Sequence, residues 1–202
     1  MIELGRHPIS IVYDLSERYG FDLTISFSEY FYRPQTTFDE REVFTVAISD
    51  VSPAWVQERI ARLRDGWELA LNSLVTDKRG RSFHIPMMDF VGEEVPDVHR
   101  ASFSEVLGRD IARDLQFFFS GRSFHAYAAT LLKRGDWVRF MGKLLLLSEG
   151  HSTKVDCRWV GHRLLGGYSA LRWSANSRLH NQMPERLSPK SLLRSNSEPN
   201  SN

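Results

Sequence analysis

The feature that most constrains the fold is an irregular order of strand-like and helix-like segments along 202 residues. Two strands are predicted early, at residues 22–28 and 42–48, and we expect them to pair. A third is predicted at residues 82–91, and LQFFF at 115–119 is a fourth. Because this order is neither strict strand–helix alternation nor all strand, it predicts an α+β fold with helices over a mostly antiparallel sheet.

Two helices are expected between these strands. Ser52 and Pro53 supply a cap and a first-turn proline to a segment whose apolar residues recur at three- and four-residue steps as far as Leu74. Ser102 and Glu105 form a capping box at the start of the second. The apolar stripe of this second helix consists of Phe103, Leu107 and Ile111.

Residues 136–174 are predicted to contain one more helix and two strands. Asp136 is expected to cap the helix, and strands are predicted at 153–159 and 168–174 around GHRLLGG, which is either a bend or a short helix. The helix residues that fit the helical period, whose aromatic members we place in the core, are Trp137, Phe140, Met141, Leu144 and Leu145.

Chain length predicts one domain over residues 1–183. Within it we expect an N-terminal α/β part at 1–81 and a second part at 82–183 that carries the motifs described below. The remaining residues, 184–202, are rich in Pro, Ser and Asn and are expected to form a flexible tail.

Charge is distributed unevenly although the net charge is only +1. Residues 1–108 hold 11 Lys and Arg against 18 Asp and Glu, whereas residues 109–180 hold 12 against 5. A concentration of positive charge is expected of a surface that meets phosphates, and ordinary solvated charge is the alternative.

The single cysteine, Cys157, excludes an internal disulfide and fits a reducing compartment. No apolar run approaches the roughly 18 residues that span a bilayer, and the amino terminus does not have the order of a secretion signal. We therefore expect a cytoplasmic protein that is not inserted in a membrane.

The stretch FFFSGRSFHAY, residues 117–127, ends an apolar strand in a polar turn. Gly121 permits a tight turn, while the hydroxyls of Ser120 and Ser123 and the imidazole of His125 can donate to an anionic oxygen. These residues suit a nucleoside triphosphate. The alternative is an ordinary strand-end turn with a structural histidine.

Two aspartates, Asp89 and Asp156, lie in apolar segments predicted to be strands. Burying a carboxylate is costly unless a cation compensates it, and Mg²⁺ bound with a nucleotide takes one or two carboxylates plus phosphate oxygens. Both are therefore candidate metal ligands. Taken singly, each can instead face water at a strand end or pair with Arg158 or Arg172.

Basic and polar residues cluster between 158 and 176. Guanidinium groups recognise phosphate oxygens bidentately, and three interleaved aromatics, Trp159, Tyr168 and Trp173, suit base stacking. The alternative places the aromatics in the core and the arginines on a solvated rim. The clustered residues are Arg158, His162, Arg163, Arg172, Ser174 and Asn176.

Taken in order, these segments resemble the archaeo-eukaryotic primase superfamily, which includes primases and primase-polymerases. IPMMDFV resembles the family's Asp-x-Asp strand, FFFSGRSFHAY its Ser-x-His element, KVD its apolar-Asp element, and LRWSANS a later nucleotide-contacting stretch. The resemblance spans about residues 82–180.

The resemblance implies an RRM-like catalytic unit packed against an N-terminal α/β unit, with the active site between them. It implies that Asp89 and Asp156 hold Mg²⁺ or Mn²⁺, that Ser123 and His125 bind the incoming triphosphate, and that Arg172 neutralises it. The implied reaction is attack of a 3′-hydroxyl on the α-phosphate, positioned by two metals. Implied partners are nucleoside triphosphates, DNA or RNA, and a protein such as a helicase or a defence-system subunit.

The Asp-x-Asp motif is incomplete. Its second aspartate falls at Val91, and if the motif ends at Asp89 its first falls at Met87. Glu93 is a substitute ligand if the strand continues past Gly92. Loss of a carboxylate weakens binding of two ions, so two hypotheses stand: a nucleotide- and nucleic-acid-binding protein with nucleotidyltransferase activity, or a catalytically inactive subunit of an antiviral defence or mobile-element assembly.

Two further classes of function remain open. A non-nucleotide interaction domain would use the motif residues only as structure. A metal-dependent nuclease would use the same aspartates with water as the nucleophile.

Overall fold

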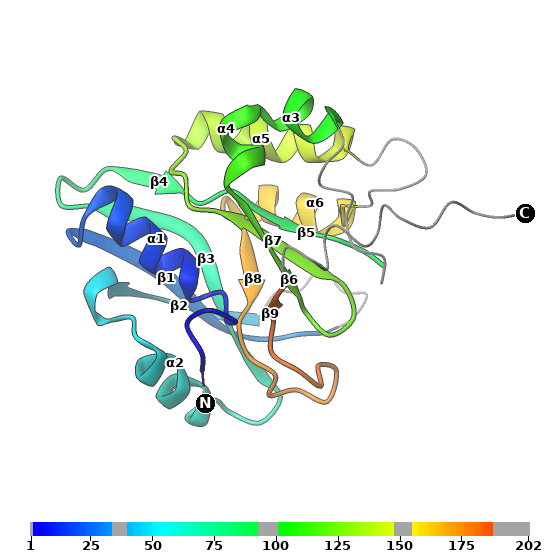
Figure 1. Ribbon diagram of the computed structural model, residues 1–202. Coiled ribbons are helices and arrows are strands. Elements are labelled where there is room, and N and C mark those ends of the chain that lie inside the picture. The colour runs from blue at the N-terminus through cyan, green and yellow to red at the C-terminus, as the bar shows by residue number, and fades with distance from the viewer. Residues whose placement is uncertain (1, 34–39, 93–100, 148–154, 188–202) are drawn as a thin grey trace, which may run out of the picture.

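The computed structural model describes residues 2–33, 40–92, 101–147 and 155–187 (Figure 1). Helices and antiparallel strands are mixed along the chain. The strands are β1 Leu23–Phe31, β2 Glu40–Ala47, β3 Trp67–Asp77, β4 Ser82–His84, β5 Met87–Asp89, β6 Leu115–Phe119, β7 Phe124–Ala128, β8 Ala170–Arg172 and β9 Glu185–Arg186. The helices are α1 Ser10–Tyr19, η1 Ile48–Asp50, α2 Pro53–Ala61, α3 Ala101–Leu107, α4 Arg109–Asp114, α5 Arg134–Leu146 and α6 Cys157–Gly166.

The strands form two sheets. The first has the order β2-β1-β3-β4, with β8 also paired to β3, and the second has the order β5-β7-β6-β9. Each strand pair in the described ranges is antiparallel. The α+β class with antiparallel sheets is therefore confirmed, as is the pairing of the first two predicted strands, which meet at Phe27 and Phe44.

The second sheet is buried on both faces. Successive strand residues point to opposite sides, so Phe118 packs in the core beneath the first sheet while Phe117 packs in a second core beneath α3, α5 and α6. The helices lie over this outer face (Figure 1). As predicted, Trp137 and Phe140 of α5 are buried, but Leu145 is exposed.

The predicted helix from Pro53 to Leu74 is wrong beyond Ala61, because β3 begins at Trp67. Ser52 caps α2 as expected, its hydroxyl accepting a bond from the Trp55 N–H. Trp67, Leu71 and Leu74 of β3 are spaced four and three residues apart, so they also satisfy a helical spacing, which explains the error.

Three other elements differ from the predictions. The strand at 82–91 is divided into β4 and β5, which lie in different sheets. The helix with the Phe103 stripe is interrupted at Gly108, whose φ of +91° ends α3 before α4 begins. The strand predicted at 168–174 is the short β8.

The strand prediction for residues 153–159 is wrong over 155–159, the part of this range that the structure describes. Val155 makes a single bridge with Phe90, and Asp156 then caps α6 by accepting the Trp159 N–H at 2.9 Å. Aspartate is a favoured N-cap residue, which explains why a helix begins directly after it.

The predicted division at residue 81 does not separate the sheets, because β4 and β8 both pair with β3. Part of the predicted tail is ordered structure: Glu185–Arg186 form β9 against β6, and the Leu187 N–H donates to the Phe117 carbonyl. The rest, 188–202, lies outside the described residues. Among the helices described, none has the length and apolar character needed to cross a bilayer.

Candidate functional site

A cavity of about 400 Å³ lies where the two sheets meet α6. Its walls come from the ends of β1 and β2, from β5 and the β6–β7 turn, and from α6 and β8. Three distant stretches of the chain, around Asp89, His125 and Asp156, therefore meet at one polar hollow.

Most of the predicted site residues line this cavity, while two do not. Gly121 and Ser174 are absent from its described walls, and Glu93 lies outside the described residues. The predicted residues that do line it are Asp89, Ser120, Ser123, His125, Asp156, Arg158, His162 and Arg172.

Asp89 and His125 face each other across the β5–β7 pair. They are register partners, and the His125 Nε2 lies 3.7 Å from the Asp89 Oδ1. Burial, helped by the charge of Arg172, holds the pKa of His125 well below its ordinary value, so the ring is neutral. Its buried Nδ1 has no hydrogen-bond partner in the described part of the chain. An unpaired buried polar atom is costly, which marks this ring as a candidate ligand contact.

Asp156 is held beside Asp89 by the backbone. The Asp156 N–H donates to the Asp89 carbonyl at 2.8 Å, next to the Phe90–Val155 bridge. Burial, reinforced by the negative charge of Asp156, raises the pKa of Asp89 to about 8. The charges of Arg172 and Arg163 only partly offset this effect. The charge of Asp156 thus opposes the ionisation of Asp89, and a cation between the two side chains would remove that cost.

The donor set suits one hard divalent cation. Carboxylate oxygens are the ligands that Mg²⁺ and Mn²⁺ prefer, and Mg²⁺ commonly keeps waters and substrate phosphates for its other positions. Val91, 44% exposed, lines the cavity where a further carboxylate would complete the Asp-x-Asp motif. Within the residues described, no group of three or more His, Cys, Asp or Glu is arranged to hold a metal ion.

The turn between β6 and β7 is built from its own residues. The Ser120 N–H donates to the Ser123 carbonyl at 2.8 Å, and the Ser120 hydroxyl donates to the same carbonyl at 3.0 Å. Gly121 has φ +98°, and a Cβ there would lie 2.9 Å from a side-chain carbon of Gln182. Ser120 and Gly121 therefore shape the turn, while Ser123 and Arg122 present side chains to the cavity.

Arg172 is buried in the cavity wall and connects three segments. Its guanidinium donates to the carbonyls of Ser120, Ser174 and Gln182. Because these donors are already engaged, Arg172 supplies fixed positive charge and holds the walls together. Of the two interpretations of Trp173, the structure bears out the core one rather than base stacking, because the ring is fully buried against Phe27.

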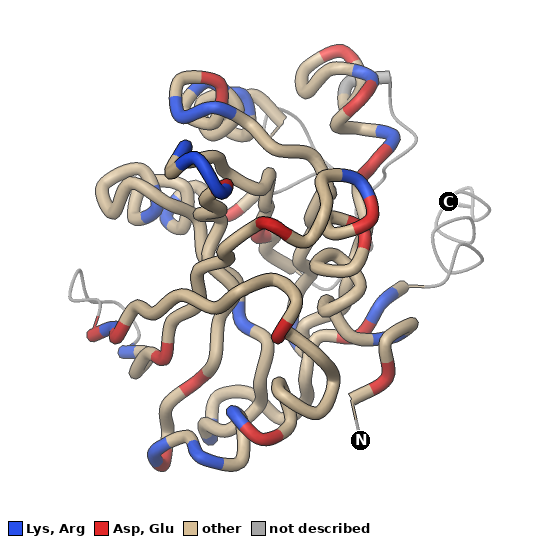
Figure 2. Tube along the Cα trace, turned by 90° about the vertical axis from the view of Figure 1, so that its left-hand side faces the viewer, with Lys and Arg blue, Asp and Glu red and all other residues tan. Residues whose placement is uncertain are grey.

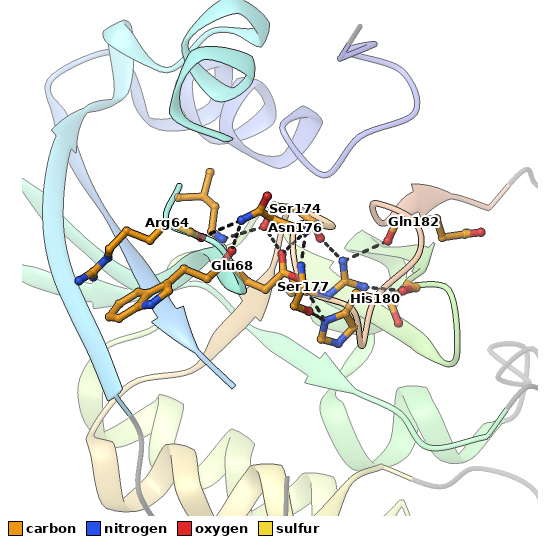
Figure 3. A network of polar contacts seen from close by, with 11 residues as sticks. Arg64, Glu68, Ser174, Asn176, Ser177, His180 and Gln182 are labelled. Atoms are coloured by element: carbon orange, nitrogen blue, oxygen red, sulfur yellow. Dashed lines mark hydrogen bonds and ion pairs between the residues drawn. The ribbon is translucent and has the colours of Figure 1, made fainter. Parts of the chain in front are cut away.

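A second polar cluster at the cavity was not predicted. Glu68 of β3 is fully buried, and its carboxylate accepts the Asn176 N–H at 3.0 Å and the Ser177 N–H at 2.8 Å (Figure 3). It also accepts the Ser174 hydroxyl, whose oxygen in turn accepts the Leu69 N–H. Ser174 is therefore a structural residue of this network, which we call the Glu68 network. The glutamate between apolar residues in WELALN is the one sequence signal for it.

Burial opposes the charge of Glu68, but its hydrogen bonds with His180, Ser174, Ser177 and Asn176 outweigh burial and lower its pKa to about 2. The His180 Nδ1 lies 3.2 Å from the Glu68 Oε1. Since an ionised carboxylate only accepts hydrogen bonds, this nitrogen carries the proton. The network thereby holds the His180 ring in the cavity wall.

The charges that line the cavity indicate where a phosphate could bind more clearly than the distribution of charge along the sequence does. Residues of both signs occur over the whole molecule (Figure 2), so the positive half of the sequence does not form a separate positive half of the structure. Six arginines line the cavity against two carboxylates among the described residues. These arginines are Arg33, Arg41, Arg122, Arg158, Arg163 and Arg172.

The fold and the site define a class of protein: an α+β domain with a pair of carboxylates and a neutral histidine inside an arginine-rich cavity. A family model described as AEP-like, archaeo-eukaryotic primase 1D-like, matches residues 47–185. This is more than half of the chain, and the chain therefore belongs to this family. The predicted relationship to archaeo-eukaryotic primases is confirmed.

Among solved structures, the chain is similar to the catalytic domain of primase Repb', determined in complex with initiator DNA. The two are 10% identical, the match covers 93% of this chain and 92% of that chain, and the TM-score is 0.48. No curated protein sequence matches.

Proposed function

We propose that this protein binds a nucleoside triphosphate together with one divalent cation in the cavity between its sheets. The observation that carries the proposal is the juxtaposition of Asp89 and Asp156 within a wall of six arginines. A polyphosphate needs positive charge along its length, and its cation needs oxygen ligands. The cavity supplies both, in a volume within the usual range of ligand sites.

The roles follow from placement. Asp89 and Asp156 would hold Mg²⁺ or Mn²⁺, which when bound neutralises phosphate charge and orients the phosphates. Arg158 and His162 lie one helical turn apart on α6, so both can face the phosphates from one side. Ser123 approaches from the β6–β7 turn, and the neutral His125 can donate a hydrogen bond without adding charge.

Nucleotide binding is tested by thermal unfolding with ATP and Mn²⁺. At about 100 times the dissociation constant, a ligand stabilises a protein by about 2.7 kcal/mol, or roughly 5–10 °C for this size. Asp89→Asn and Arg158→Gln should each remove most of this rise. Asp110→Asn is the matched control, because that side chain is 92% exposed on α4 and lies outside the cavity walls. No rise for the unmodified protein would overturn the proposal.

Nucleotidyl transfer is the second candidate function, favoured by the carboxylate pair beside His125 and by membership in a primase family. The valine at position 91 leaves one carboxylate fewer than the family motif, so we expect slow transfer. Labelled nucleotide incorporation on a single-stranded template with Mn²⁺ tests it, and Asp156→Ala should abolish any product. Shortening of the labelled strand would instead indicate nuclease activity.

In this proposal nucleic acid is the second ligand, and a helicase or a defence-system subunit is the kind of partner a primase-like subunit would serve. Direct binding of a single-stranded oligonucleotide tests the nucleic-acid part.

A further inference from the structure

The cavity has an aromatic end that the roles above leave unused. The last residues of β1 and the two that follow, residues 30–33, all line it, and the Tyr32 side chain lies near the His180 ring. The two ring centroids are 6.2 Å apart and the planes are tilted by 48°. Aromatic rings pack favourably with centroids about 4.5–7 Å apart, so the pair is in contact but not stacked.

The two rings differ in freedom. His180 is held through Nδ1, which lies 3.2 Å from the Glu68 Oε1 and 3.0 Å from the Ser177 hydroxyl. Tyr32 follows the end of β1 and is 47% exposed. A fixed ring loses little conformational entropy when a ligand packs on it, and an exposed ring can rotate to cover the ligand. One rigid face and one adjustable face suit a flat heteroaromatic group.

We propose that His180 and Tyr32 bind a nucleobase at the exposed side of the cavity, an inference that rests on the proposed nucleotide binding. The base packs on the imidazole face, and Tyr32 covers its outer side. The Glu68 network acts as a positioning element, because it fixes the ring on which the base packs. The base can belong to the bound nucleotide or to a single strand, and the shared chemistry is aromatic stacking, which tolerates any base.

Three ligands separate these possibilities: ATP, inorganic tripolyphosphate, and a short single-stranded oligonucleotide, each titrated in the presence of Mn²⁺. The variants are Tyr32→Leu, which removes the ring, Tyr32→Phe, which keeps it, and His180→Asn, which keeps a donor for Glu68 without the ring. Phe21→Leu is the control, because that side chain is 67% exposed and does not line the cavity.

Stacking of one base contributes about 1–3 kcal/mol, so Tyr32→Leu and His180→Asn should each weaken ATP binding about tenfold. Tyr32→Phe, Phe21→Leu and all tripolyphosphate affinities should stay unchanged. A loss confined to the oligonucleotide also supports the inference and assigns the base to a strand. Unchanged affinity for both base-containing ligands, or an equal loss for tripolyphosphate, overturns it. If the unmodified protein binds none of the three ligands, the proposed function fails first.

Discussion

Glu68 and Asp89 are carboxylates of two neighbouring sheets beside the same cavity, and their surroundings affect them in opposite directions. Glu68 is fully buried yet has a pKa lowered to about 2, because four residues of one loop direct hydrogen bonds to it. The Asp89 side chain has a pKa raised to about 8, because burial opposes its charge and the negative charge of Asp156 adds to that effect. The comparison shows that burial alone does not set the pKa of a carboxylate, because hydrogen-bond donors lower it and a neighbouring negative charge raises it.

The largest expected effect is the loss of stability when Glu68 is replaced. Glu68→Gln replaces one acceptor oxygen by an NH₂ group that faces the donors of residues 174–180, so about 3 kcal/mol of unfolding free energy should be lost. Urea denaturation measures this loss. Glu58→Gln, at an exposed position of α2, should change stability by less than about 0.5 kcal/mol. A small effect of Glu68→Gln would mean that the network is not a stabilising one.

The same carboxylate predicts a pH dependence. Because the pKa of Glu68 falls from 4.5 to about 2 on folding, the unfolded chain binds more protons, and stability rises with pH through this window. The contribution, about 3 kcal/mol, is complete above about pH 5 and is lost as the pH falls toward 2. Unfolding free energies measured from pH 2 to 6 should rise less steeply for Glu68→Gln than for the unmodified protein. Parallel curves would contradict the assignment.

Cation binding at the cavity should become tighter when a carboxylate is placed at position 91. Val91→Asp adds a carboxylate at the cavity wall beside Asp89, so Mn²⁺ should bind about tenfold more tightly. Calorimetric titration with Mn²⁺ measures the change, and Val91→Asn controls for polarity without charge. Equal affinities in the aspartate and asparagine variants would show that position 91 does not face the cation.

The smallest expected effect is a gain in stability. Asp89→Asn removes a carboxyl whose ionisation is opposed by burial and by Asp156, so the ligand-free protein should become more stable by about 1 kcal/mol. Denaturation without metal, with Asp110→Asn beside it, measures the difference. A loss of stability instead would place Asp89 among the structural acids, with Glu68.

Sequence reasoning predicted several of the residues that line the cavity and missed the Glu68 network. Asp89, His125 and Asp156 were predicted because polar residues interrupt apolar segments in a motif order that resembles a family. Glu68 was missed because Trp67, Leu71 and Leu74 have a spacing that also fits a helix, so the segment was assigned to a helix and Glu68 to its polar side. The bonds that satisfy Glu68 come from a loop far along the chain, and no local pattern indicates such a pairing.

The fold class followed from the order of elements, whereas their exact bounds did not. Asp156 was assigned to a strand because its neighbours are apolar, but its side chain forms an N-cap that starts α6. The contact of Tyr32 with His180 has no local signal, because it depends on how β1 and the loop after β8 meet in space.

The alternation of Phe117 and Phe118 between the two cores has a consequence for how the chain tolerates insertions. A shift of β6 by one residue would exchange the two rings between the cores. It would also move the β6–β7 turn, with its serines, away from the cavity. The packing of these two rings thus fixes the register of β6 and with it the position of the polar turn. Natural variants of this strand should therefore differ in composition far more readily than in length.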